Sequence, residues 1–177
     1  MRAFKHARTP QGKVVADRLR DINPDIDVSE RQEFFLPENS ANFDFSSYDF
    51  VIDAIDTVSA KIEIAVKCTE LGIPMISSMG TGNKLDPTAL RISDLAKTSG
   101  CPLARVMRRE LKKRGILHLP VVYSEEAPIK PEQLNEGESK KVTPASIAFV
   151  PSVAGLYAAS VAIKTLIASD LSSREAR

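Results

Sequence analysis

The chain has 177 residues, of which 43% are hydrophobic and 27% are charged, and its formal net charge is +1. This length supports one domain with a substantial core, and the composition is that of a globular protein rather than a disordered chain. The net charge points to neither an acidic nor a basic partner, and we expect no membrane span because no apolar run approaches the roughly 18 residues that a span needs.

The two cysteines, Cys68 and Cys101, stand far apart in the sequence. They form neither the dense pattern of a disulfide-stabilised secreted domain nor a CxxC metal motif. We therefore expect a protein of a reducing compartment, the cytoplasm.

Apolar periodicity predicts helices and strands along most of the chain. In chain order, the expected elements are a helix over 10–22, strands over 26–35 and 48–55, a helix over 57–71, a strand over 73–78, an edge strand over 90–92, a helix over 101–114, strands over 118–123 and 146–150, and a helix over 152–168. The β–α–β succession over 48–78 indicates a parallel α/β sheet. Its first strand contains Phe50-Val51-Ile52, a run typical of a strand buried on both faces. The following helix should end at Gly72 and carry Lys61 on its polar face.

Three segments should lack regular structure. The stretch 79–88 has the glycines and proline of a loop, and 124–144 is polar and rich in Glu, Lys and Pro, which predicts a flexible loop. Residues 170–177 should form a frayed tail. The alanine-rich face of the helix over 152–168 suits close packing on a sheet or on a second subunit.

Two aspartates, Asp53 and Asp56, stand where the predicted strand 48–55 gives way to a helix. Asp56 occupies the position of an N-cap, where a carboxylate accepts hydrogen bonds from the first turn. It also stands at the carboxyl end of a parallel strand, where α/β sheets bind ligands and where a carboxylate can hold Mg²⁺ together with phosphates. Local physics leaves both readings open.

The sequence contains no glycine-rich phosphate loop, neither GxGxxG opening a βαβ unit nor GxxxxGK[ST]. A doubly wound nucleotide-binding fold normally begins with a strand and such a loop, whereas this chain opens on a predicted helix. Either the fold is a different one, or its first half is missing from the chain.

Several motifs together resemble one family. They are Gly12-Lys13, INPD at 22–25, VIDAID at 51–56 and SMGTGNKLDPT at 78–88. With these, the chain resembles the ThiF/HesA-type adenylating enzymes, which are relatives of ubiquitin-activating enzymes. CPLARVMRRELKKRGI at 101–116 and SIAFVPSVAGL at 146–156 are similar to the tRNA threonylcarbamoyladenosine dehydratases of that family.

The resemblance implies a Rossmann-like α/β fold with a mainly parallel sheet and a C-terminal helix, in a single domain over 1–177 that lacks its first βαβ part. The family's GxGGVGS loop, ribose-binding acid and Asn-x-x-Arg motif precede the helix that begins here near residue 10. The resemblance also implies a homodimer that uses ATP and Mg²⁺ to adenylate a carboxylate. In the dehydratase branch, a ligase-like activation lets the threonylcarbamoyl group of a modified tRNA adenosine close to a cyclic form with net loss of water.

The family's nucleotide-binding residues fall on matching positions of this chain. Asp56 corresponds to the magnesium-linked catalytic aspartate, and Thr57 and Val58 would lie beside the nucleotide. Lys13 corresponds to a lysine that contacts ATP, although a solvated helix lysine is the plainer reading. Asp53 would have a supporting structural role.

The residues that could contact the substrate can be interpreted either as binding residues or as ordinary loop and surface residues. In the loop over 78–88, Asn83 and Lys84 are the polar candidates for substrate contact. One helix face carries a basic stripe that could bind tRNA phosphates or simply be solvated: Arg105, Arg108, Arg109 and Lys112. Cys101 could be a reactive thiol at a helix N-terminus, but a structural role is preferred.

Two other functions compete with the dehydratase. One is adenylation of a small sulfur-carrier protein, whose enzymes can bind zinc through paired CxxC motifs; because this sequence has none, we expect no zinc. The other is a truncated chain without enzyme activity that serves as a binding or dimerisation partner.

Overall fold

A computed structural model describes residues 10–129 and 145–175 of the chain. The chain divides into two compact units, Met1–Phe35 and Leu36–Arg177. The single domain expected over 1–177 stays a prediction.

The first unit contains one helix, α1 (Gln11–Ile22), within its described residues. The helix predicted over 10–22 is thus confirmed. The strand predicted over 26–35 is wrong, because this stretch has no regular secondary structure. A strand needs a neighbouring strand for its backbone, whereas the Val28 carbonyl accepts a hydrogen bond from the Arg20 guanidinium at 3.1 Å.

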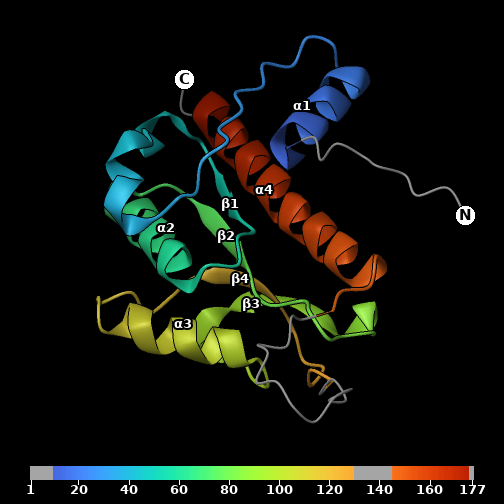
Figure 1. Cartoon of the computed structure of the whole chain (residues 1–177). Helices are drawn as coiled ribbons and strands as arrows, with labels where there is room; N and C mark the ends of the chain where they lie inside the picture. The colour runs from blue at the N-terminus through green and yellow to red at the C-terminus, as the bar shows by residue number, and fades with distance from the viewer. Residues whose placement is uncertain (1–9, 130–144, 176–177) are drawn as a thin grey trace, which may run out of the picture. The chain divides into compact units, whose positions relative to one another are not determined.

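The second unit is built on a four-stranded sheet in the order β1-β2-β4-β3 (Figure 1). Its strands are β1 (Val51–Asp53), β2 (Met75–Ser78), β3 (Leu90–Asp94) and β4 (Pro120–Ser124). β1, β2 and β4 run parallel, and β3 pairs with β4 in the antiparallel direction. The mainly parallel Rossmann-like sheet is confirmed, and so is the edge strand predicted at 90–92.

Among the strands in residues 10–129 and 145–175, β1 lies at the other edge of the sheet, because its one neighbour there is β2. Val51 is half-buried and Ile52 is 48% exposed. The expectation of a strand buried on both faces is therefore wrong for these residues. An apolar run does not by itself distinguish a central strand from an edge strand.

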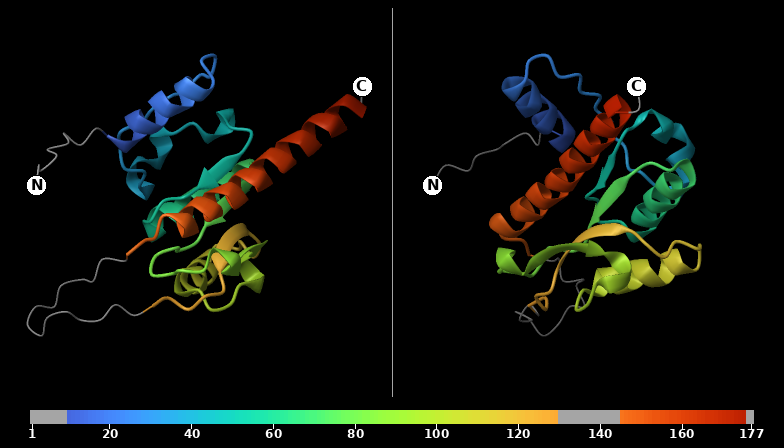
Figure 2. Two further views of the ribbon diagram at one scale, coloured as in Figure 1. Left: turned by 90° about the vertical axis from the view of Figure 1, so that its right-hand side faces the viewer. Right: turned by 180° about the vertical axis from the view of Figure 1, so that it is seen from behind.

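Among the described residues of this unit, three α-helices cover the sheet on its two faces. They are α2 (Val58–Leu71), α3 (Pro102–Lys112) and α4 (Phe149–Glu175). α4 crosses all four strands on one face, and α2 and α3 pack against each other on the opposite side (Figures 1 and 2). The described part of the unit also contains four short 3-10 helices: η1 (Pro37–Asn42), η2 (Phe45–Ser47), η3 (Pro87–Ala89) and η4 (Leu95–Lys97).

The core between α4 and the sheet is made of branched strand residues and small helix residues. Ile76 and Val122 from the sheet meet Val150, Ala154 and Ala158 of α4. The alanines let the helix approach the sheet closely, which is the packing that the alanine-rich face predicts. On the opposite side, α2 ends at Gly72 in the left-handed conformation with φ 68°, which confirms its predicted C-cap.

α4 is longer at both ends than the sequence suggests. It begins at Phe149, so the strand predicted over 146–150 is wrong, and it continues to Glu175, where a frayed tail was expected. A short apolar run cannot be assigned to helix or strand by periodicity alone. The Arg174–Asp170 ion pair, 3.0 Å long and one turn apart, supports the last turns.

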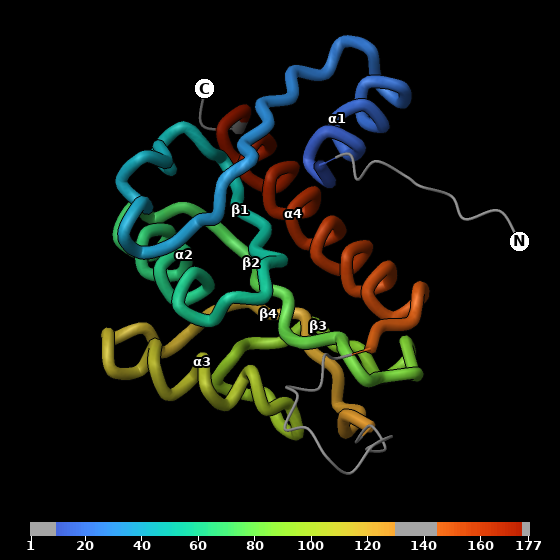
Figure 3. Tube along the Cα trace, in the orientation of Figure 1, coloured from blue at the N-terminus to red at the C-terminus, as the bar shows by residue number. Residues whose placement is uncertain are grey.

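By length and composition alone, α4 could also cross a membrane. An 18-residue window within Phe149–Arg174 has a mean hydropathy of 1.5, and 22% of it is buried. The absence of a membrane span therefore stays a prediction. The buried part of the helix lies on the sheet, as the trace in Figure 3 shows.

Candidate functional site

A pocket of about 760 Å³ opens beyond the carboxyl ends of β1 and β2. Its wall comes from five parts of the second unit: 54–56 with Lys61, 78–84, 101–103, Pro128, and 145–146 with Pro151. This is the edge at which parallel α/β sheets bind ligands, because strand ends and helix starts meet there. The pocket therefore joins the VIDAID and SMGTGNKLDPT motifs in one place.

Asp56 lines this pocket with an exposed side chain. The N-cap of α2 is Thr57, and no side chain caps that helix, so the capping interpretation of Asp56 is wrong. Within residues 10–129 and 145–175, its carboxylate has no hydrogen bond or ion pair. Asp56 is thus a carboxylate at a strand end whose oxygens are available to a ligand.

Asp53 has the supporting structural role expected of it. Its side chain is fully buried, and Oδ2 accepts hydrogen bonds from Lys61 Nζ at 2.8 Å and from Ser77 Oγ at 2.5 Å. Oδ1 accepts one from the backbone N–H of Ile55 at 3.2 Å. Asp53 therefore ties β1, α2 and β2 together directly below the loop that carries Asp56.

Lys61 is the residue that sequence reasoning missed. We placed it on the solvent-facing side of the helix, yet it is 1% exposed and lines the pocket. The signal was available in Asp53, because a carboxylate at the end of a buried strand requires a cation or several donors. Lys61 lies in the first turns of the helix that follows, within reach of that strand end.

Asn83 closes the base of the pocket loop. Its φ of 57° puts it in the left-handed region, which asparagine tolerates better than most residues. Its N–H donates to the Ala145 carbonyl at 2.7 Å, and its Oδ1 accepts from the Ala145 N–H at 2.8 Å. Its own carbonyl accepts from the Ile129 N–H at 2.7 Å. The side chain predicted to contact substrate thus has a structural partner.

Lys84 lines the same pocket but is only 2% exposed. Its Nζ donates to the Ser124 carbonyl at 3.2 Å. Burial lowers the pKa of the Lys84 ammonium, and this shift is opposed by the nearby Cys101 thiol and Glu126 carboxylate. A buried cation bonded to a neutral carbonyl favours an anionic ligand beside it.

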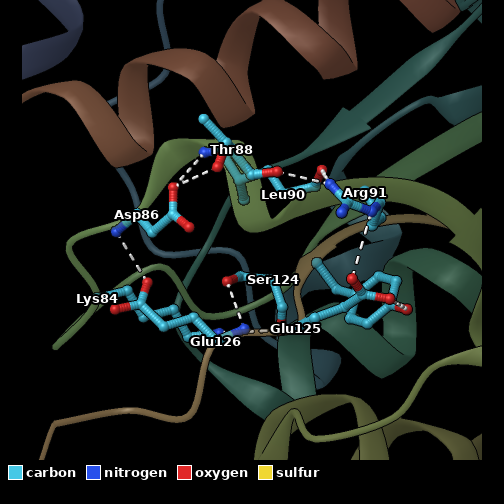
Figure 4. A network of polar contacts seen from close by, with 9 residues as sticks. Lys84, Asp86, Thr88, Leu90, Arg91, Ser124, Glu125 and Glu126 are labelled. Atoms are coloured by element: carbon cyan, nitrogen blue, oxygen red, sulfur yellow. Dashed lines mark hydrogen bonds and ion pairs between the residues drawn. The ribbon is translucent and has the colours of Figure 1, made fainter.

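The loop after Lys84 is fastened to the end of β4. The Glu126 carboxylate accepts hydrogen bonds from the N–H groups of Leu85 and Asp86, both at 3.0 Å. Figure 4 shows the bond from Asp86. Ser124 belongs to β4, and Glu126 donates its N–H to Ser124 Oγ at 3.1 Å. Of the flexible loop expected over 124–144, residues 130–144 lie outside the described residues.

Cys101 is the N-cap residue of α3 and lines the pocket, but it is buried. Its side chain makes no capping hydrogen bond. It is a free thiol, as is Cys68. Cys68 is a buried residue of α2. Burial and the nearby Asp53 carboxylate raise the pKa of its thiol to about 11.

The basic stripe on α3 is interrupted. Arg108 is half-buried, and its guanidinium donates to the Leu95 carbonyl at 3.0 Å, to the Thr98 carbonyl at 2.6 Å and to Thr98 Oγ1. Arg109 is exposed but pairs with Glu110 at 3.0 Å. Arg105 and Lys112 are exposed. Arg108 therefore fixes η4, and the other three side chains form the solvent-facing part of the stripe.

The remaining predicted nucleotide residues lie on helix starts. Thr57 and Val58 begin α2 next to Asp56, without being part of the pocket wall formed by described residues. Lys13 is exposed on α1 in the first unit. Their roles at a nucleotide stay predictions.

A metal ion would need ligands besides protein side chains. Within residues 10–129 and 145–175, no group of three or more His, Cys, Asp or Glu could hold a metal. One free carboxylate does fit Mg²⁺ that is bound together with a nucleotide, since that ion takes one or two carboxylates plus phosphate and water oxygens. Asp56 is the residue that would hold it.

The chain is similar to tRNA threonylcarbamoyladenosine dehydratases in both sequence and structure. The Bacillus subtilis enzyme of that name is 40% identical over 157 residues, which cover 83% of this chain and 62% of that protein. Crystal structures of the Escherichia coli tRNA N6-threonylcarbamoyladenosine dehydratase in complex with AMP and with ATP each match with a TM-score of 0.78 at 32% identity. These matches cover 91% and 90% of this chain and 65% of each relative.

The chain thus spans less than two thirds of the length of these relatives. A family model described as the ThiF family matches residues 3–176. This match takes in both described units and every residue of the pocket wall. The chain belongs to the ThiF family.

Proposed function

We propose that this chain acts in the ATP-dependent dehydration of threonylcarbamoyladenosine in tRNA. The observation that carries the proposal is the free Asp56 carboxylate in a pocket at the carboxyl ends of parallel strands. The similarity to dehydratases, one of them crystallised with ATP, supports a nucleotide as the ligand of this pocket.

The proposed reaction has two steps, adenylation of the carboxylate and ring closure. An oxygen of the threonylcarbamoyl carboxylate attacks the α-phosphorus of ATP, and pyrophosphate leaves. Attack from within the same activated group on the acyl carbon then closes the ring and expels AMP, which keeps the carboxylate oxygen, while a proton is released. Because that oxygen leaves on AMP, the nucleoside loses the elements of water.

The residues of this chain divide that work between them. Asp56 would hold Mg²⁺, which offsets negative charge on the phosphates when it is bound. Thr57 and Val58 would lie beside the nucleotide, and Lys13 would neutralise charge that develops on the phosphates. Lys84, a buried cation that lines the same pocket, would attract the carboxylate of the substrate, and Asn83 would shape the loop.

The tRNA would meet the solvent-facing side of α3. Arg105, Arg109 and Lys112 are exposed there, and cations of this kind bind phosphates irrespective of sequence. Arg108 would act indirectly, by fixing η4. The plainer reading, a solvated helix face, is the outcome if tRNA affinity does not depend on these side chains.

We propose that the chain forms a homodimer through α4 and acts in the cytoplasm. Leu156, Ile163 and Ile167 are 67%, 57% and 55% exposed and follow one another at helical spacing. An exposed apolar stripe of this kind is typical of an interaction surface, and α4 of a second copy of the chain could bury it. We favour this cover over a lipid bilayer because the opposite side of the helix packs on the sheet.

Turnover by this chain tests the proposal. Wild-type protein is incubated with ATP, Mg²⁺ and tRNA that carries threonylcarbamoyladenosine, and the cyclic nucleoside and AMP are measured by mass spectrometry. We expect both products, and loss of both in Asp56→Ala with the fold retained by circular dichroism. Near-normal turnover by Asp56→Ala would refute the role of that residue.

The same assay separates the two competing functions. AMP released with a small sulfur-carrier protein, and not with tRNA, would place the chain in the neighbouring adenylating class. A folded dimer that forms no AMP with either substrate would favour a binding or dimerisation partner.

A further inference from the structure

Two aspartates stand at the carboxyl end of β1: Asp53 is its last residue, and Asp56 lies three residues further along. Of the two, Asp56 lines the pocket. Its oxygens are free, whereas Asp53 directs both oxygens into the protein. Lys61 links Asp53 to the pocket, because it is part of the pocket wall and forms a 2.8 Å ion pair with Asp53.

The Asp53–Lys61 pair is buried on both sides, at 0% and 1% side-chain exposure. Ser77 Oγ donates to the same Asp53 oxygen at 2.5 Å and lies 3.4 Å from Lys61 Nζ. The two charges cancel where water cannot screen them, so Lys61 lines the pocket without adding a net charge to it. Without Lys61, Asp53 would keep its hydrogen bonds from Ser77 and Ile55 but would lack a counter-charge, three residues before Asp56.

That difference changes what the pocket attracts. Two neighbouring carboxylates bind a divalent cation without help and repel nucleotide phosphates. A single carboxylate binds Mg²⁺ weakly by itself, and phosphate oxygens must complete the coordination shell. The number of carboxylates available to the cation therefore decides whether the cation and the nucleotide bind independently or together.

We propose that Lys61 is a positioning residue that couples cation binding to nucleotide binding, by withdrawing Asp53 and leaving Asp56 as the one available carboxylate. This inference rests on the proposed function, which supplies the cation and the nucleotide. It assigns Lys61 no contact with substrate. Its effect passes through the Asp53 carboxylate.

The test compares metal binding with and without ATP. Calorimetry at about pH 8 measures the Mg²⁺ affinity of wild type, Lys61→Met and Asp53→Asn/Lys61→Met. We expect Lys61→Met to bind Mg²⁺ alone at least about tenfold more tightly than wild type, and ATP to increase that affinity less. The double variant, with a neutral pair of similar size, should return to wild-type behaviour.

Lys67→Met is the matched control, because it removes a half-buried lysine from the same helix. Its metal and ATP affinities should equal those of wild type. Equal Mg²⁺ affinity of wild type and Lys61→Met, both folded, would overturn the inference. So would a double variant that has lost ATP binding, since Lys61 would then contact the nucleotide itself.

Two further outcomes remain decisive. If Lys61→Met does not fold, the double variant decides alone: wild-type coupling supports the inference, and lost coupling contradicts it. If wild type binds no ATP, the proposed function fails, but tighter Mg²⁺ binding by Lys61→Met without nucleotide would still support the withdrawal of Asp53.

Discussion

Asn83 holds Ala145 by hydrogen bonds in both directions, although 62 residues separate them in the chain. A third bond, from the Ile129 N–H to the Asn83 carbonyl, brings in the chain on the other side of 130–144. One residue therefore joins the pocket loop to both flanks of that segment.

Replacing Asn83 should separate the contribution of its side chain from that of its backbone. Asn83→Gly keeps the positive φ and the backbone bond to Ala145 but loses the side-chain bond from the Ala145 N–H. It should therefore lower the free energy of unfolding by about 1–2 kcal/mol. Asn83→Ala adds the strain of a left-handed non-glycine residue and should cost about 2–3 kcal/mol. Urea unfolding measures both. Equal losses would mean that the backbone conformation contributes nothing.

The basic stripe on α3 should respond unevenly to charge reversal. Arg105→Glu with Arg109→Glu should weaken tRNA binding and flatten its salt dependence by about one unit of slope per lost phosphate contact. Filter binding across a salt series measures this. Arg108→Ala is the contrasting variant: it should lower stability, because the Leu95 and Thr98 carbonyls lose their donor. If the double variant keeps the tRNA affinity and the salt dependence of wild type, this face of α3 is a solvated surface and not a tRNA-binding one.

Lys84 should give a signature in stability against pH. Burial lowers its pKa below 10.5, so between the folded pKa and 10.5 the unfolded chain binds more protons than the folded one. Stability of wild type relative to Lys84→Met should therefore rise with pH across that window and be lowest below it. Urea unfolding of both proteins over an alkaline pH series measures the difference. A flat difference would show that the ammonium is not desolvated.

The exposed stripe of α4 should control oligomeric state. Ile163→Glu places a charge in the middle of the proposed interface and should convert a dimer to a monomer, because an unpaired charge in an apolar interface is costly. Light scattering after size exclusion gives the mass. Lys164→Glu changes charge on the neighbouring exposed residue and should stay dimeric. A monomeric wild type would contradict the proposal directly.

Cys68 should be inert while the protein is folded. With a pKa of about 11, roughly a thousandth of this thiol is ionised at pH 8, and it is also buried. In Cys101→Ser, which leaves Cys68 alone, a thiol reagent should react only after urea is added. Because the folded pKa lies above the usual 9.0, stability should fall as pH rises from about 9 through 11. Rapid labelling of the folded variant would show that α2 opens locally.

The parts that could be predicted were those where local sequence decides the outcome. Gly72 ends α2 because few other residues accept its backbone conformation, and the parallel sheet follows from strand–helix–strand spacing. The failures are non-local. Whether 26–35 is a strand depends on a partner strand, and whether Ile52 is buried depends on which strands flank β1. Lys61 looked solvent-exposed because its partner, Asp53, lies on another element.

The position of β4 between β2 and β3 has a consequence for how the second unit folds. β3 precedes β4 in the chain yet pairs with it alone, so Leu90–Asp94 must wait for Pro120–Ser124 before its backbone is satisfied. Pairing across such a separation is slow compared with local helix formation. The pocket wall also needs residues that follow β4, up to Pro151. The pocket is thus a late product of folding, and a ligand bound there would stabilise the whole unit rather than one element of it.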